Sequence, residues 1–404
     1  MLTPEVALSS ILGELRPLGG EESVPISEAA GRVLAREVVS DLDLPPFEKS
    51  AMDGFAVHAA DFAAAAAPDG ERTLPILGES RAGEPFRGAV PPGTCVAIYT
   101  GAEVPAECDA VVMVERTRAA GDERVCLRDA PRVGQNICNR GQDLTRGAVV
   151  LRPGRRLRPV ELSVLAAVGC EPVPVFRRPR VSVLTSGDEL VTPDRRPGPG
   201  QIREGNTLHL AAMCRAAGAQ VLASGIVGDE VAVLREAFAA ALADSDVLIT
   251  TGGVSMGKYD LVGETLEALG ARCVFHKVAI KPGKPLWFGM RGAVPIFALP
   301  GNPVSCLVNQ QVFVRPALDL LSGAEPSAVR RRGRWTGAAA AANERERYVP
   351  VRATGDEDGI VLLERVRWNG SADVVGLSAA EALAVIPADT PCPPGTVLDY
   401  VPLV

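Results

Sequence analysis

The sequence contains few of the residues on which several common catalytic and metal sites depend. Its only three histidines, His58, His209 and His276, lie in unrelated stretches, which gives little support to Ser-His-Asp catalysis or a histidine metal cluster. The nine cysteines are spread from Cys95 to Cys392 with no C-x-x-C spacing, so neither a disulfide framework nor a structural zinc site is indicated. A cytoplasmic location is the simplest interpretation.

Other features are scarce as well. No apolar run approaches the roughly 20 residues of a membrane span, and the first residues lack the basic and apolar regions of a secretion signal. A net charge of −7 with interspersed signs argues against a nucleic-acid partner, because phosphate neutralisation needs clustered basic residues. Aromatic residues make up only 4%, beside 41 Gly and 33 Pro, which indicates small aliphatic cores joined by tight turns. A chain of 404 residues predicts two to four domains.

The stretch from Thr250 to Asp260 is the strongest local signal of a ligand site. The apolar run Val247-Leu248-Ile249 predicts a buried strand that ends just before Gly252 and Gly253. Open α/β sheets bind ligands at the carboxyl ends of their strands, and paired glycines let backbone N–H groups approach an oxyanion without a Cβ in the way. Ser255 adds a hydroxyl group, and Asp260 could hold a metal or a ligand hydroxyl. Taken alone, the paired glycines favour the simpler interpretation of a glycine turn into a helix capped by Asp260.

Four further motifs accompany this stretch, and together they are specific. They are Ser50-Ala51-Met52-Asp53-Gly54-Phe55-Ala56, Thr185-Ser186-Gly187-Asp188-Glu189-Leu190, Ile280-Lys281-Pro282-Gly283-Lys284-Pro285 and Leu299-Pro300-Gly301-Asn302-Pro303-Val304-Ser305. Over nearly its whole length the sequence resembles the MoeA family, the molybdopterin molybdenumtransferases, which includes the E domain of gephyrin. The resemblance implies a transferase that inserts molybdate into adenylyl-molybdopterin, with Mg²⁺-dependent release of AMP, to give molybdenum cofactor. It also implies a homodimer, with molybdopterin adenylyltransferase as the upstream partner.

The resemblance further implies a multidomain α/β plus β fold. Its parts are a discontinuous linking domain of residues 1–45 with 138–178, a β-rich inserted lobe of residues 46–137, a three-layer α/β domain similar to MogA at residues 179–324, and a C-terminal β-barrel-like domain at residues 325–404. From the residues alone, everything before about residue 178 would be one mixed domain. Strands that alternate with helices between Val181 and Leu299 predict a parallel sheet. Near the N-terminus, Thr3 and Pro4 predict a helix start, and a second helix is predicted from Ser27.

The candidate catalytic and metal residues lie mainly on predicted strand-end loops. Asp229 and Asp260 are hard oxygen ligands suited to Mg²⁺, which would assist cleavage of the adenylate linkage. Lysines that face the cleft would stabilise anions, although a lysine more often faces solvent. No protein thiol is required, because the substrate brings its own sulfurs. Lys277 and Lys281, four positions apart with Lys284 following, are the candidate lysines for stabilising anions. The resemblance assigns a ligand-orienting role to Asp53 and ligand contact to Thr100. Asp143 and Glu189, on a predicted turn and a predicted strand-end loop, are further candidate catalytic acids.

The resemblance also implies an oxyanion pocket between the proline loop and the C-terminal domain. Pro300, Pro303 and Ser371 match that pocket directly. The family pattern Arg-x-Glu-Tyr-x-Arg aligns with Arg345-Glu346-Arg347-Tyr348-Val349-Pro350 in this sequence. Arg345 therefore occupies the position of the first arginine, whereas Pro350 replaces the second. Arg347 could substitute for Arg345, since residues two apart on a strand share a face.

Two alternatives remain open at this stage. The α/β domain also resembles molybdopterin adenylyltransferase, but that family normally consists of the single α/β domain. A catalytically idle dimeric scaffold, as in a gephyrin-like structural role, is the other. The retained acids and lysines favour an enzyme over a scaffold. The sequence does not distinguish a preference for molybdate from a preference for tungstate.

Overall fold

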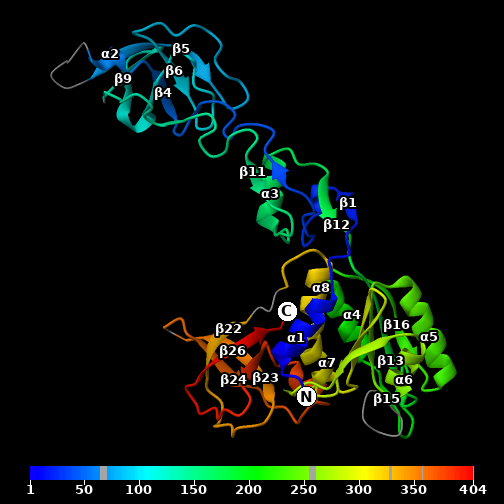
Figure 1. Cartoon of the computed structure of the whole chain (residues 1–404). Coiled ribbons are helices and arrows are strands. Elements are labelled where there is room, and N and C mark those ends of the chain that lie inside the picture. The colour runs from blue at the N-terminus through cyan, green and yellow to red at the C-terminus, as the bar shows by residue number, and fades with distance from the viewer. Residues whose placement is uncertain (64–70, 129, 254–260, 327–329, 357, 404) are drawn as a thin grey trace. The chain divides into compact units, whose positions relative to one another are not determined.

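The computed structural model describes residues 1–63, 71–128, 130–253, 261–326, 330–356 and 358–403 and divides into two compact units (Figure 1). Unit 1 comprises Met1–Arg36, Pro153–Pro159 and Val173–Val404, and unit 2 comprises Glu37–Arg152 and Val160–Pro172. The predictions for Ser255 and Asp260 lie outside the described residues. Among the helices of the described ranges, none has the length and apolar character needed to cross a lipid bilayer.

A six-stranded sheet organises the α/β part of unit 1. In spatial order its strands are β16 (Gln220–Val227), β13 (Arg180–Ser186), β17 (Val247–Thr251), β21 (Val294–Leu299), β20 (Trp287–Arg291) and β18 (Arg272–His276). The first four strands run parallel, whereas β20 pairs antiparallel with both of its neighbours. The expectation of a wholly parallel sheet was therefore wrong. Only two residues separate β20 from β21, and a connection that short forces a hairpin.

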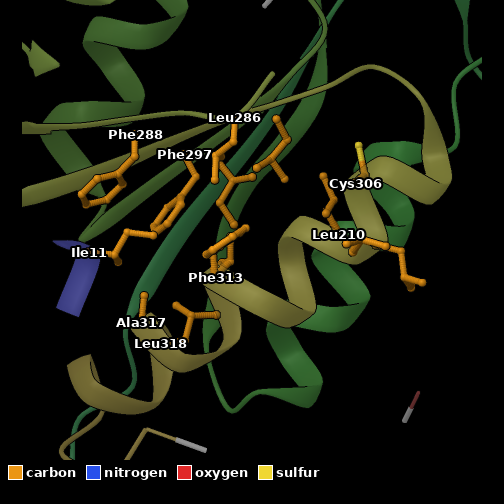
Figure 2. Close-up of a cluster of buried hydrophobic side chains, with 14 of the residues drawn as sticks. Ile11, Leu210, Leu286, Phe288, Phe297, Cys306, Phe313, Ala317 and Leu318 are labelled. Atoms are coloured by element: carbon orange, nitrogen blue, oxygen red, sulfur yellow. The ribbon is translucent and has the colours of Figure 1, made fainter. Parts of the chain in front are cut away.

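Helices cover both faces of this sheet, which confirms the three-layer α/β arrangement. One face packs against α1 (Pro4–Glu14), α4 (Asn206–Ala216), α7 (Pro303–Asn309) and α8 (Arg315–Leu321), and the other against α5 (Val231–Asp244) and α6 (Leu261–Ala268). Strand alternation decides which side chain faces which layer. Val247 and Ile249 belong to the first cluster and Leu248 to the second. Figure 2 shows Ile11, Phe297 and Phe313 meeting in the first cluster.

The two helix predictions near the N-terminus had different outcomes. The helix start at Pro4 is confirmed, with the Thr3 side chain accepting a hydrogen bond from the Val6 N–H at 3.3 Å. The helix predicted from Ser27 is wrong, because only a single 3₁₀ turn, η1 (Ile26–Glu28), forms there. The turn ends at its C-cap Ala29, and Gly31 beyond it has a φ of 73° and donates its N–H to Leu157 O instead of continuing a helix.

The C-terminal part of unit 1 is a closed five-stranded barrel, as the sequence predicted. Its strands are β22 (Arg331–Trp335), β23 (Glu346–Gly355), β24 (Val361–Arg365), β25 (Ala382–Ile386) and β26 (Val397–Pro402), and their pairing order β23-β24-β22-β26-β25 returns to β23. The short strand β19 (Ile280–Lys281) adds to β23 in parallel and places Lys281 opposite Arg347. This pairing connects the α/β domain to the barrel. The remaining elements of unit 1 are β1 (Glu21–Val24), β12 (Val173–Phe176), β14 (Leu190–Val191), β15 (Ile202–Arg203), η3 (Gln310–Val314) and α9 (Val374–Leu377).

Unit 2 is built on a separate six-stranded sheet. In spatial order it contains β7 (Ala110–Met113), β4 (Gly54–Val57), β6 (Cys95–Ile98), β5 (Arg72–Ser80), β9 (Arg124–Leu127) and β8 (Thr117–Ala119). Two short pairs continue the unit, β3 (Lys49–Ser50) with β10 (Ile137–Cys138) and β2 (Val38–Val39) with β11 (Val149–Leu151). Its helical elements are α2 (Ala60–Ala63), η2 (Val114–Arg116) and most of α3 (Pro159–Ala167).

Gly54 should be indispensable for the sheet of unit 2. A Cβ placed on Gly54 would lie 1.9 Å from Val112 O on the paired strand β7. Overpacking typically costs about 1–3 kcal/mol, and a clash with backbone should exceed that range because neither strand can yield. We expect Gly54→Ala to lower the melting temperature sharply and to expose unit 2 to limited proteolysis. Gly13→Ala is the control, since nothing lies within 4 Å of its Cβ position on α1; equal melting of the two variants would contradict the packing argument.

Candidate functional site

Two neighbouring cavities in unit 1 collect most of the predicted site residues. The first has a volume of about 580 Å³ and is called here the glycine-loop cavity because Gly252 and Gly253 line it. The second has a volume of about 780 Å³ and is called the cationic cavity. Both are lined by Pro285, Pro300 and Asn302, so these three residues form a shared wall.

The glycine pair at the end of β17 makes a turn that no other residue type could make without strain. Gly252 and Gly253 have φ values of 90° and 60°, and a Cβ on Gly252 would lie 2.3 Å from Ser186 O. The Gly252 N–H donates to Leu299 O at 3.3 Å. The Gly253 N–H, in contrast, has no hydrogen-bond partner among the described residues.

Acidic side chains line the same cavity from the loops after β13 and β16. The loops are tied together, because Asp188 Oδ1 accepts from the Asp229 N–H at 3.0 Å and Asp229 Oδ2 accepts from the Asp188 N–H at 3.3 Å. Glu189 and Asp229 both line the cavity. The two strands are parallel neighbours, so their carboxyl ends deliver these acids to one edge of the sheet. Within the described ranges, no cluster of three or more His, Cys, Asp or Glu residues is placed to hold a metal.

The cationic cavity concentrates positive charge, and the ion pair at Arg345 Nε, 3.8 Å from Glu344 Oε1, is made by a residue outside the lining. Its lining includes the side chains of Lys281, Lys284, Arg345, Arg347 and Arg365, and no aspartate or glutamate among the residues described there. Arg345 Nε, Arg347 Nε and Trp368 Nε1 are buried without a hydrogen-bond partner in the described part of the chain. Buried donors without partners are unfavourable, so an anion that draws these groups into hydrogen bonds would relieve that cost.

The residues predicted for an oxyanion pocket come together around this cavity. Pro300, Arg345 and Ser371 line it, and so does Arg347 at the start of β23, just after the bend that contains Arg345. Pro303 lines the glycine-loop cavity instead. Ser371 is fixed to the proline loop by two hydrogen bonds. Asn302 Nδ2 donates to Ser371 Oγ at 3.0 Å, and the Val304 N–H donates to Ser371 O at 3.0 Å.

Lys277 is not placed with the other candidates of unit 1. It lines neither of the two cavities, unlike Lys281 four residues later. Its backbone has a φ of 76°, and its N–H donates to Leu286 O. The left-handed conformation turns the chain between β18 and β19, which removes the strand-like spacing from which a common face could have been expected.

Unit 2 carries the remaining three candidates. Asp53 Oδ1 accepts hydrogen bonds from the backbone N–H and the Oγ1 of Thr100, both at 2.7 Å. These bonds, the backbone one foremost, lower the pKa of Asp53 and keep its carboxylate ionised. The two residues meet because β4 and β6 are paired, with Gly54 opposite Ile98. Asp143 is exposed in the turn after β10, where its N–H donates to Leu44 O.

Several lining residues were not predicted from the sequence as site residues. Asn302 lies within the motif Leu299-Pro300-Gly301-Asn302-Pro303-Val304-Ser305, so that motif was a usable signal. Arg365 and Trp368 enter the cationic cavity from the end of β24 and the loop after it. No spacing in the sequence relates them to Lys281, because closure of the barrel brings them together.

Comparisons with known proteins cover nearly the whole chain. Residues 2–169 match the model of the MoeA N-terminal region (domains I and II), residues 182–320 a probable molybdopterin binding domain, and residues 332–403 the MoeA C-terminal region (domain IV). A molybdopterin molybdenumtransferase of Haemophilus influenzae is 38% identical over 80% of this chain and 78% of its own length. One from Nostoc sp. is 36% identical over 91% of this chain and 85% of its own. The crystal structure of the molybdopterin biosynthesis MoeA protein from Pyrococcus horikoshii OT3 superposes with a TM-score of 0.85 at 28% identity, over 100% of both chains.

Proposed function

Because this chain belongs to the MoeA family of molybdopterin molybdenumtransferases, we propose that it takes adenylylated molybdopterin and molybdate, cleaves the adenylate linkage, and releases molybdenum cofactor and AMP. Its membership makes it a transferase of molybdenum cofactor biosynthesis. The observation that carries the finer proposal is the pair of cavities with a shared wall. The glycine-loop cavity is lined by glycines and acids. The cationic cavity is lined by five cationic side chains, with no aspartate or glutamate among its described lining residues.

The two cavities suit the two substrates in different ways. Molybdate is a compact dianion, and the cationic cavity offers Lys281 and Arg345 as compensating charges, with Ser371 as a hydroxyl donor. The glycine-loop cavity offers the open approach at Gly253 to a phosphate group of the pterin. Since Pro300 and Asn302 line both cavities, the two substrates would lie on opposite sides of one loop. Such proximity is what insertion of the metal into the pterin dithiolene requires.

The acids of the glycine-loop cavity fit a magnesium ion. Mg²⁺ is usually held by one or two carboxylates together with substrate phosphates and water, so a site without three protein ligands is in keeping with it. Asp229 lines the cavity and is fixed through Asp188, and we assign it, with Asp260 from outside the described residues, as the magnesium ligands. When bound, the ion would act as a Lewis acid on the adenylate phosphate. Glu189 is left to orient the pterin or a water molecule.

The test of this assignment uses protein stripped with EDTA. After incubation with adenylylated pterin and molybdate, the pterin fraction is separated and its molybdenum content is measured with and without added Mg²⁺. Molybdenum should appear in the pterin fraction only when Mg²⁺ is restored. Consumption of ATP with free molybdopterin, without any molybdate requirement, would instead identify an adenylyltransferase.

The homodimer is part of the proposal, with sites completed by residues from both subunits. Asp53 and Asp143 belong to unit 2, whereas Asp229 belongs to unit 1. In a mixed dimer of Asp53→Ala and Asp229→Ala subunits, sites formed across subunits would leave one site doubly substituted and the other intact. We therefore expect such dimers to recover roughly half of the wild-type activity per dimer, as symmetry requires. No recovery, or a monomer by light scattering, would contradict it.

Two further assignments complete the proposal. A molybdopterin adenylyltransferase is the upstream partner, because the substrate must arrive already adenylylated. All nine cysteines are free thiols, which suits a reducing compartment such as the cytoplasm.

A further inference from the structure

Two successive carbonyl groups of the proline loop are held by buried side chains from three different elements. Pro300 O accepts from Thr251 Oγ1 at 2.9 Å and from Cys306 Sγ at 2.8 Å. Gly301 O accepts from Asn206 Nδ2 at 2.7 Å. Thr251 ends β17, Cys306 lies on α7 and Asn206 begins α4, and their exposed fractions are 0%, 0% and 8%. Figure 2 places Cys306 at the edge of the first hydrophobic cluster.

These three residues, called here the carbonyl brace, fix the direction of the loop's N–H groups as well. In a planar trans peptide the N–H points opposite to the C=O. With both carbonyl oxygens directed into the protein, the N–H groups of Gly301 and Asn302 point away from it. Both residues are exposed, and in the described part of the chain neither N–H has a hydrogen-bond partner. Gly301 and Asn302 also line the cavities, so the two donors are on the side where the substrates would bind.

We propose that Asn206, Thr251 and Cys306 are positioning residues that hold the N–H groups of Gly301 and Asn302 toward an oxyanion substrate. The inference rests on the proposed function, which places molybdate and a phosphate group at this loop. If either peptide turned over, a carbonyl oxygen would replace an N–H donor and would repel the anion. The brace makes that rotation unfavourable, since a carbonyl would lose its buried partners.

The double contact on Pro300 O indicates how the brace responds to substitution. Burial raises the pKa of the Cys306 thiol to about 12, so the sulfur keeps its proton and remains a donor at neutral pH. Thr251 Oγ1 lies 3.2 Å from the same sulfur and 3.5 Å from Asn206 Nδ2, so the three side chains form one connected group. Either donor alone should hold the carbonyl in place. Loss of both should free it, and the two substitutions should therefore be non-additive.

Steady-state kinetics of Thr251→Val, Cys306→Ala and the double variant test the brace. Each single variant should raise the molybdate KM less than about 3-fold, and the double variant about 10-fold or more, because contacts in one network do not add. The pterin KM and the kcat at saturating molybdate should stay within about 2-fold of wild type, as expected when only binding of one substrate weakens. Thr251→Ser combined with Cys306→Ala keeps the hydroxyl that Thr251→Val removes, so its KM should return from the double-variant value to that of the Cys306→Ala single variant.

Matched controls separate positioning from general destabilisation. Thr250→Val makes the same change one residue earlier on β17, where the buried hydroxyl has no partner among the described residues. Cys214→Ala removes another fully buried cysteine from α4, and its sulfur makes no contact with the loop. Both should leave the molybdate KM unchanged. Thermal melts of all variants are compared to verify that the folded fractions are equal.

The outcomes distinguish this inference from the proposed function. A wild-type protein without molybdate-dependent turnover would overturn the function, whereas an active wild type with an unaltered molybdate KM in the folded double variant would overturn the brace. If the double variant does not fold, wild-type protein labelled with ¹⁵N at glycine and asparagine is titrated with molybdate alone. Shifts of the Gly301 and Asn302 amide signals are expected, and unchanged signals at saturating molybdate would overturn the inference.

Discussion

Replacement of Asp229 by asparagine should abolish turnover while the protein stays folded. The side chain lies on a strand-end loop that lines the glycine-loop cavity, outside every hydrophobic cluster. Asparagine keeps an oxygen that can accept from the Asp188 N–H, and the reciprocal bond to Asp188 Oδ1 comes from the backbone. What is lost is the negative charge that would hold Mg²⁺. A Lewis acid contributes several kcal/mol to the stabilisation of the transition state, so we expect a rate loss of about 1,000-fold or more.

Asp188→Asn is the matched control, because Asp188 belongs to the same reciprocal pair but does not line the cavity. It should retain most of the activity. Asp260→Asn is expected from the sequence to behave like Asp229→Asn, although Asp260 lies outside the described residues. Full AMP release by the Asp229 variant would exclude it as a metal ligand, whereas loss of soluble protein would indicate that the side chain serves the fold.

Replacement of Arg345 by alanine should raise the molybdate requirement sharply while leaving pterin binding nearly unchanged. Arg345 lines the cationic cavity and not the glycine-loop cavity, so the two substrates should respond differently. A charge-assisted contact is worth about 1.5–3 kcal/mol, which corresponds to roughly one to two orders of magnitude in affinity. Molybdate dependence of AMP release at saturating pterin gives the effect directly.

Arg347→Ala and Arg352→Ala complete this comparison. Arg347 lines the same cavity and pairs across from Lys281, so it is the second candidate for the same contact. Arg352 is exposed further along β23 and should have no effect. Wild-type molybdate dependence in both Arg345→Ala and Arg347→Ala would move the oxyanion site elsewhere.

The sequence predicted those parts of the fold whose signals are local. Thr3 with Pro4 marked a helix start, and α1 begins there. The apolar run at Val247 indicated a buried strand, and period-two alternation then decides which face each side chain occupies. The strand Trp287–Arg291 was missed, although its aromatic pair Trp287-Phe288 between Pro285 and Gly292 is a local strand signal.

Residues of the candidate site could be predicted from the sequence where they belong to a recognisable motif. They could not be predicted where only the folding of the chain brings them to the cavity. The loops at Gly252 and Pro300 were located from their glycine and proline residues. Trp368 and Arg365 reach the cationic cavity only because the barrel closes and β19 pairs with β23. Lys277 lines neither cavity although only four positions separate it from Lys281, and its left-handed backbone turns the chain between the two.

The most direct test of the central claim is AMP release by the purified wild-type protein given adenylylated pterin and Mg²⁺, with molybdate added or withheld. Our account predicts that AMP and molybdenum-loaded pterin appear together, in equal amounts, only when molybdate is present. AMP release at the same rate without molybdate, or no release when all three components are supplied, would contradict it.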